Sequence, residues 1–283
     1  MILHMATIFI PEVFADAVNE KLNKTLRFGS VAFDASSLVP EIKNAGDTMH
    51  FPKIKRTATV ENVVKGNALT PAELDMSDST AEIKYIGSAF RIYDEDKAQV
   101  KGVLQDKIVA QVSDAMAEQI DTDLAAECDT AVFKSAVADA AKITSDELQK
   151  GIDNFGDSVD TDNFAAIIIN SKLRSSFAGM DEFVNTGLTY QTDGNGLVQN
   201  GVVGSYFGIP VIVTDNGTWD STAGEAKTYI VKKDALGYVF QKAITVEESR
   251  EALLLATDVV ASSLYATKLL DDTGIVICRK TIA

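Results

Sequence analysis

Residues 55–80 form the stretch that most restricts how this chain can fold. They separate two segments in which apolar and polar residues alternate, "DTMHFPKI" and "IKYIGSAFRIY", and this alternation predicts two extended strands. The stretch between them carries both signs of charge and offers few apolar side chains to bury. Because loops of this length are uncommon inside compact domains, we predict an extended two-stranded finger whose contacts come from outside its own chain.

Residues 103–137 contain neither Gly nor Pro and are rich in helix formers, so we predict one long helix there. Apolar residues recur along it at intervals of four: Leu104, Ile108, Val112, Met116, Ile120, Leu124 and Cys128. Since four residues overshoot one turn by about 40°, this stripe winds round the helix. The pattern is typical of a spine contacted on different sides, and equally of a plain core helix.

Residues 6–28 read as an arm that carries a short amphipathic helix after Pro11. Its apolar residues lie near helical spacing: Val13, Phe14, Val18, Leu22 and Leu26. This apolar face is large for so short a helix, and it needs a surface to pack on.

The second half of the chain mixes helices and strands without repeats, which indicates the α+β or α/β class. A capping box at Thr144–Glu147 predicts a short helix, "FAAIIIN" a buried strand, and "SKLRSSF" a helical turn. Glycine-rich residues 179–201 predict a mobile loop. Further strands are expected at "GSYFGIPVIVTDNG", "AKTYIVKKD", "GYVFQKAITVEES" and "GIVICRK", with an apolar helix over residues 252–270 before the last.

The charge balance argues against a dedicated nucleic-acid binder. Lys and Arg total 26 against 41 Asp and Glu, which gives a formal net charge of −15, and no basic cluster interrupts the acidic excess. A phosphate backbone would be repelled over most of such a surface. No stretch approaches the roughly 18 uninterrupted apolar residues that a membrane span needs.

The sequence contains few residues that could form a catalytic or metal-binding site. Two cysteines, Cys128 and Cys278, and two histidines, His4 and His50, make neither a zinc site nor a disulfide framework, and we expect two buried thiols. The Asp-Thr-Gly at Asp272 resembles the catalytic turn of aspartic proteases, but that chemistry needs two facing carboxylates.

We therefore interpret Asp272 as part of a turn that joins strands, and the acid pairs as solvated acids at helix starts and turns. These pairs are Asp94/Asp96, Asp121/Asp123 and Asp160/Asp162. No phosphate-binding glycine motif or nucleophile elbow is present in the sequence. The sequence predicts neither an enzyme nor a bound cofactor or metal.

Taken in order, these segments resemble the major capsid proteins of tailed bacteriophages, which share the Hong Kong 97 shell fold. A strand like Gly204–Val211 with the pattern Gly-x-x-x-Gly-Ile-Pro-Val, preceded by a phrase like "AIIINSKLRSSF", is common in that family's axial domain. The resemblance covers nearly the whole chain and rests on the order of the segments.

The resemblance implies an α+β fold in four parts. These would be an amino-terminal arm (residues 1–28), an extended loop (53–84), a peripheral domain with the spine helix (29–52, 85–137 and 239–272) and an axial domain (138–238 and 273–283). The chain begins almost directly with the arm, so we expect a scaffolding segment to be a separate protein or already cleaved.

The implied function is self-assembly into the icosahedral head shell of a tailed phage, around double-stranded DNA that is enclosed but not specifically bound. Implied partners are copies of the chain in hexamers and pentamers, a scaffolding protein, a portal and a maturation protease. Assembly is expected in the bacterial host cytoplasm and the product in the virion. Candidate intersubunit contacts are Phe9, Phe14, Arg56, Val60, Val63, Val64, Lys65, Leu69 and Met76. An encapsulin-type nanocompartment shell and a soluble α/β enzyme are the alternatives.

Overall fold

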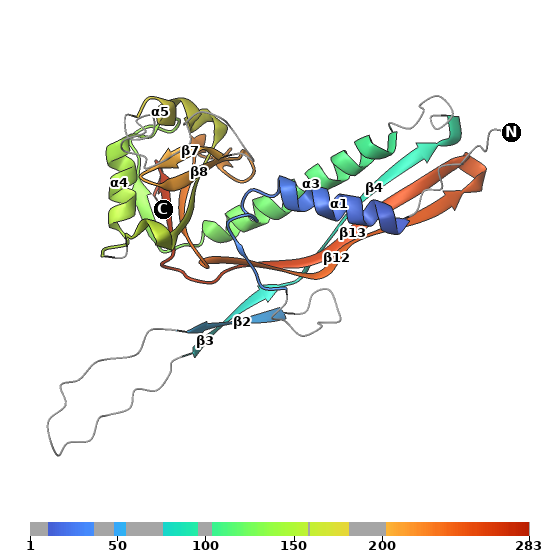
Figure 1. Cartoon of the computed structure of the whole chain (residues 1–283), viewed down its shortest axis with the longest axis horizontal. Helices are drawn as coiled ribbons and strands as arrows, with labels where there is room; N and C mark the ends of the chain where they lie inside the picture. The colour runs from blue at the N-terminus through green and yellow to red at the C-terminus, as the bar shows by residue number, and fades with distance from the viewer. Residues whose placement is uncertain are drawn as a thin grey trace, which may run out of the picture.

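The structure is a computed structural model that describes residues 11–36, 48–54, 76–95, 104–157, 159–180 and 202–282. Figure 1 shows a six-stranded sheet with short helices at one end, from which a long helix and three long strands extend. A two-stranded finger projects from the middle of the molecule at an angle to both. The fold is therefore mixed α and β, as predicted.

The six-stranded sheet has the strand order β5-β14-β11-β6-β8-β7. Its strands are β5 (Phe133–Ala136), β6 (Phe164–Ile169), β7 (Val202–Tyr206), β8 (Ile209–Val213), β11 (Thr228–Lys232) and β14 (Ile275–Arg279). The pairs β14–β5 and β6–β8 are parallel, and the others are antiparallel. The buried strands predicted at "FAAIIIN", "AKTYIVKKD" and "GIVICRK" are thus confirmed.

Both faces of this sheet are buried, which explains its continuous apolar runs. In β6, Ile167 and Ile169 pack in a cluster with α4 (Ser145–Asp153) and α5 (Arg174–Ala178), while Ile168 packs toward the long helix. The predicted capping box is present at the start of α4, where the Glu147 side chain accepts a 2.8 Å hydrogen bond from the Thr144 backbone N–H. Short 3-10 helices, η1 (Thr161–Asn163) and η2 (Ser171–Leu173), flank β6.

The second sheet has four strands in the order β1-β12-β13-β4. Its strands are β1 (Phe33–Asp34), β4 (Lys84–Tyr93), β12 (Leu236–Glu251) and β13 (Ala256–Leu269). The long hairpin of β12 and β13 joins through η3 (Ala252–Leu254), and β4 pairs with β13 along its whole length. Register shifts near Lys242 interrupt the ladder between β12 and β13.

One face of the four-stranded sheet is covered by two helices, α1 (Pro11–Thr25) and α3 (Leu104–Cys128). Val18 and Leu22 are buried on the apolar side of α1, as is Leu26 directly after it, so the predicted arm helix finds its packing surface within its own subunit. Asn19 fixes α1 to β12, because its side-chain amide exchanges hydrogen bonds with the backbone of Ile244 at 3.2 and 3.3 Å.

The apolar ladder of α3 is buried from Ile108 to Cys128, as predicted. It belongs to one core that contains residues of α1, of both sheets and of the segment after α1. The helix is therefore contacted on several sides, which favours the spine interpretation over the plain core helix.

Two helix predictions are wrong. The spine helix ends at Cys128 instead of residue 137, and after a turn residues 133–136 form β5, which gains a parallel ladder with β14. Residues 252–270 form mainly β13, because β12 and β4 pair with it on both edges and both of its faces are covered along part of its length. In both places tertiary pairing overrides the local helix preference of Ala and Leu.

The segment quoted as one strand, residues 204–217, contains a tight hairpin. β7 ends at Tyr206 and β8 begins at Ile209, and the two residues between them, Phe207 and Gly208, have φ angles of 48° and 84°. Positive φ at both central residues is the geometry that a two-residue hairpin turn requires.

The finger consists of β2 (Thr48–Ile54) and β3 (Met76–Glu82), paired antiparallel from Thr48↔Glu82 to Ile54↔Met76. The predicted strand 47–54 is confirmed, but its partner is β3, which was assigned to the loop, and not β4. The tip of the predicted extended loop and most of the glycine-rich stretch 179–201 lie outside the described residues. A further small pair, β9 (Trp219–Asp220) and β10 (Glu225–Ala226), sits beside the six-stranded sheet.

Candidate assembly interface

The base of the finger is anchored on the face of the four-stranded sheet opposite the one that α1 and α3 cover. Phe51, Ala81 and Ile83 are buried there, in a cluster with Val239 of β12 and Ala266 of β13. The ladder then leads away from the body of the molecule (Figure 1). The described stem thus ends, at Ile54 and Met76, away from the core on which it starts.

The turn between β12 and β13 exposes three consecutive leucines at the opposite end of the sheet from the six-stranded half. Leu253, Leu254 and Leu255 are 98%, 51% and 64% exposed. Leu255 also has a φ of 49°, in the left-handed region that a bulky residue rarely adopts. Clustered exposed leucines at a hairpin turn are unfavourable in an isolated subunit and are typical of an interaction site. We call Leu253–Leu255 the leucine tip.

Two bidentate ion pairs hold the strands around the leucine tip. Arg250 of β12 donates to both carboxylate oxygens of Asp94, which follows β4, at 2.7 and 2.5 Å. Arg91 of β4 donates to both oxygens of Asp258 in β13, at 2.7 Å each. These hydrogen bonds lower the pKa of Asp258. The Asp94 backbone N–H also donates to the Leu255 carbonyl at 2.9 Å. The end of β4 is thereby fixed to the turn that carries the leucines.

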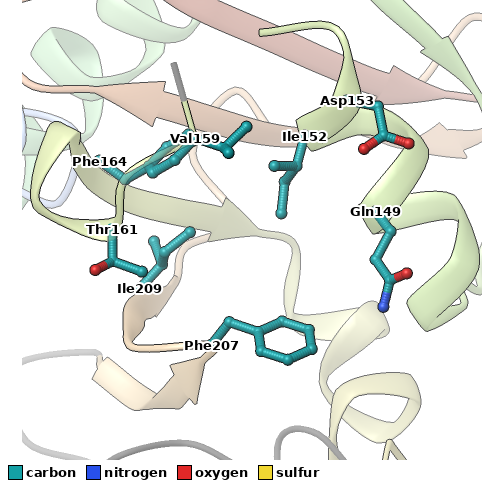
Figure 2. Close-up of a pocket in the computed structure, with 8 residues that line it drawn as sticks. All are labelled: Gln149, Ile152, Asp153, Val159, Thr161, Phe164, Phe207 and Ile209. Carbon is teal, nitrogen blue, oxygen red and sulfur yellow. The ribbon is translucent and has the colours of Figure 1, made fainter. Parts of the chain in front are cut away.

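A pocket of about 230 Å³ lies between α4 and the β7–β8 turn (Figure 2). Its floor is apolar, with the side chains of Ile152, Phe164 and Ile209, and its rim includes the exposed Gln149 and Asp153. Among the described residues that line it, no histidine, cysteine or serine is present and Asp153 is the one ionisable group. The one hydroxyl in this lining, that of Thr161, lies across the pocket from Asp153, so the lining places no base beside a nucleophile (Figure 2).

The residues considered as catalytic candidates from the sequence have structural roles. The thiols of Cys128 and Cys278 are buried, and burial raises the pKa of Cys278 to about 12, so neither is a ready nucleophile. Asp272 lies in the turn before β14, where the neighbouring Asp271 carboxylate accepts hydrogen bonds from the backbone and hydroxyl of Thr273. The turn interpretation of the Asp-Thr-Gly sequence is confirmed.

The prediction that Asp121 and Asp123 are solvated acids is wrong. Asp121 is fully buried and accepts backbone hydrogen bonds from the segment after α1. Asp123 accepts from the Tyr265 hydroxyl and pairs with Lys84 at 2.9 Å. Sequence spacing alone did not distinguish them from surface acids, because their partners come from distant parts of the chain.

Comparison with known proteins decides what this arrangement belongs to. A family model described as "Phage capsid protein" matches residues 77–278, which is most of the chain. The chain belongs to the phage capsid protein family. Its relatives include the major capsid protein of Staphylococcus phage phiMR11, which is 27% identical over 265 residues, 93% of this chain and 90% of that protein.

Solved capsid structures share the fold of this chain. A chain from Mycobacterium phage Che8 superposes with a TM-score of 0.66 at 17% identity, covering 91% of this chain and 92% of the other. The capsid of cyanophage P-SCSP1u gives 0.66 at 14% identity over 91% and 89%. A virus-like particle from Pyrococcus furiosus gives 0.58 at 14% identity over 95% and 98%. The Hong Kong 97-type shell fold is thus confirmed.

This phage capsid protein is a structural component of the virion and not an enzyme. It is a major capsid protein, and copies of it build the shell. Within the described part of the chain, no helix combines the length and the apolar character needed to cross a membrane.

The structure describes two of the candidate contact residues predicted from the sequence. Phe14 lies in α1 and Met76 is the first residue of β3. The others lie outside the described residues: Phe9, Arg56, Val60, Val63, Val64, Lys65 and Leu69. Sequence reasoning missed the leucine tip, because "ALLL" was assigned to a helix. The signal available was the run of β-branched residues shortly after it, Thr257, Val259 and Val260, which favours a strand and therefore a turn before it.

Proposed function

We propose that the chain closes into an icosahedral head shell of hexamers and pentamers around double-stranded DNA. The observation that carries this proposal is the finger, whose stem is anchored by Phe51, Ala81 and Ile83 but points away from its own subunit. Ordering one residue costs roughly 1–2 kcal/mol of backbone entropy. A loop with few apolar side chains of its own can offset this entropy cost only by contacts with another surface. We propose that a neighbouring copy of the chain provides that surface.

In this proposal residues 53–84 are the extended loop that reaches across the next subunit. The contacts are the candidates Arg56, Val60, Val63, Val64, Lys65, Leu69 and Met76, with Phe9 and Phe14 contributed by the arm. Apolar side chains among them would bury surface, and Arg56 and Lys65 would find acidic partners on a subunit whose formal net charge is −15.

The four-stranded half is the peripheral domain and the six-stranded half the axial domain of this proposal. The leucine tip would meet the tips of other peripheral domains at local threefold axes, which removes exposed leucine from water. The axial domains would gather at the centre of each hexamer or pentamer. The glycine-rich stretch 179–201 belongs to this half in sequence.

A shell of this type implies further partners and a place of assembly. We infer a scaffolding protein that guides curvature, a portal for DNA entry and a maturation protease, with assembly in the host cytoplasm. The acidic balance of the chain, 41 Asp and Glu against 26 Lys and Arg, favours DNA that is enclosed without being gripped.

Shortening the finger tests the proposal. Since β3 begins at Met76, residues 57–74 can be replaced by a short Gly-Ser turn that leaves the ladder from Ile54↔Met76 onward. We expect the subunit to fold with a nearly unchanged circular dichroism spectrum and to form no closed shells in electron micrographs. A full-length control with Val63→Ser and Val64→Ser should retain the stem and assemble less efficiently. Closed particles of normal size from the shortened chain would contradict the proposed role, as would unfolding of its monomer.

A further inference from the structure

Asp121 is a buried carboxylate that none of the proposed intersubunit contacts uses. It lies in the C-terminal half of α3 and is 0% exposed. Its Oδ2 accepts a hydrogen bond from the backbone N–H of Arg27 at 2.9 Å, and its Oδ1 accepts from Phe28 and Gly29 at 3.0 and 3.3 Å. A single side chain on the spine helix thus satisfies three successive backbone donors of the segment that follows α1.

The same carboxylate reaches the six-stranded half. The Asn216 side chain, in the loop after β8, lies close enough to Asp121 to lower the pKa of its carboxyl group. The next residue, Gly217, approaches the helix so closely that a Cβ there would lie 2.3 Å from the Cβ of Ala125. This close approach and a φ of 67° both require glycine. Asp121 therefore joins three segments: α3, the turn after α1 and the loop after β8.

The turn held by Asp121 also acts as a spacer between the two halves. Phe28 is fully buried and meets the ring of Tyr229 in β11 edge-on, with the ring centroids 5.6 Å apart. The Tyr229 hydroxyl donates to Asp129, which follows α3, at 2.9 Å, and Lys227 pairs with the same carboxylate at 2.5 Å. The contact between spine and six-stranded sheet is thus fixed at both Asp121 and Asp129.

A buried carboxylate is a poor means of gaining stability, since burial disfavours its charge and raises the pKa of Asp121 against the effect of its hydrogen bonds. Asp121 instead contributes to the geometry of the fold. Its three backbone donors fix the turn after α1 on α3, and the loop after β8 lies against the same part of the helix through Gly217. This geometry affects the whole subunit. From Asp121 to the far end of α3 at Leu104 is about 25 Å at 1.5 Å per residue, so a rotation of about 5° at the joint would move that end by about 2 Å.

We propose that Asp121 is a positioning residue that fixes the angle between the two halves of the subunit, and through this angle the curvature of the shell. The inference rests on the proposed assembly into a closed shell. In such a shell the leucine tip contacts neighbours at one end of the spine and the six-stranded half contacts them at the other. The angle between the halves then determines the shell radius at which all of these contacts can form at the same time.

The test is the diameter distribution of particles formed by Asp121→Asn, measured by electron microscopy. Asn offers one acceptor oxygen in place of two and turns an N–H₂ group toward a backbone donor. We expect folded subunits that assemble into particles of mixed diameter or into open sheets. Asp114→Asn is the matched control, because Asp114 lies on the same helix, is exposed and pairs only loosely with Lys21 at 3.5 Å. It should give wild-type particles.

A milder variant guards against misfolding of Asp121→Asn. Asn216→Ala removes the contact with the loop after β8 and leaves the three backbone hydrogen bonds in place. It should fold normally and still broaden the diameter distribution. A narrow wild-type distribution from this variant, or from a folded Asp121→Asn subunit, would overturn the role of Asp121. Failure of the wild-type chain to form shells would instead overturn the proposed function.

Discussion

The leucine tip and two bidentate ion pairs lie together at the end of the β12–β13 hairpin. The pairs Arg250–Asp94 and Arg91–Asp258 are largely solvent-exposed, and exposed ion pairs add little to stability. Their bidentate geometry instead restricts where the turn can lie. At the scale of single residues, the proposed assembly surface is therefore a strained apolar turn held in place by two cross-strand ion pairs.

Polar substitution of the leucine tip should separate assembly from folding. Leu253 is 98% exposed, so Leu253→Ser should change the free energy of unfolding by less than about 0.5 kcal/mol, as is usual for surface positions. Shell yield should fall strongly, because the apolar contact between tips is lost. Val132→Ser is the matched control, since Val132 is exposed but lies far along the chain, after α3. Sizing chromatography with thermal unfolding measures both effects. Equal shell yields for the two variants would contradict an interface at the tip.

At the scale of elements, sequence patterns identified those whose partners are local or whose burial is uniform. The capping box placed α4, and the apolar runs of β6 and β14 placed two central strands. They failed for β13, because Ala and Leu favour a helix and the pairing with β4 comes from distant sequence. The stem of the finger was found on its β2 side alone, since "MSDSTAE" in β3 has little hydrophobic pattern.

The proposed assembly surface could be predicted from the sequence only in part. The finger could be inferred, because a long polar stretch between two strands has no core of its own. The leucine tip was missed because Ala and Leu favour a helix. The role of Asp121 could not be inferred, because it depends on which distant segments the face of α3 meets. Burial of Asp121 by residues 27–29 and Asn216 is a property of the tertiary structure alone.

The hydrogen bonds of Glu147 at the start of α4 predict a stability that depends on pH. Burial opposes its ionisation, but hydrogen bonds from Ala138 and Thr144 outweigh that and lower its pKa. Because the pKa is lower in the folded state, the stabilisation is present above about pH 4.3, the ordinary Glu value, and is lost as pH falls through the lowered value. Glu147→Gln should cost about 1 kcal/mol at pH 7 and less at pH 3. Urea unfolding at both pH values measures this, and an equal cost at both would contradict it.

For the whole molecule, the charge balance predicts how the subunit treats DNA. With a formal net charge of −15, the isolated protein should bind duplex DNA weakly at physiological salt. Fluorescence anisotropy with a labelled duplex would measure the affinity at several salt concentrations. A sub-micromolar dissociation constant near 150 mM salt would show that the shell grips its contents.

The whole molecule carries the proposed contact elements at three separated places: the leucine tip, the finger and the six-stranded half. A subunit with contacts at three places and a rigid spine between them is suited to a closed lattice rather than to a dimer.

Electron microscopy of the purified, unmodified chain is the most direct test of that claim. The account predicts closed, icosahedral particles of uniform diameter in which each finger lies on a neighbouring subunit. A homogeneous monomer, or a small closed oligomer with the finger packed on its own subunit, would contradict it.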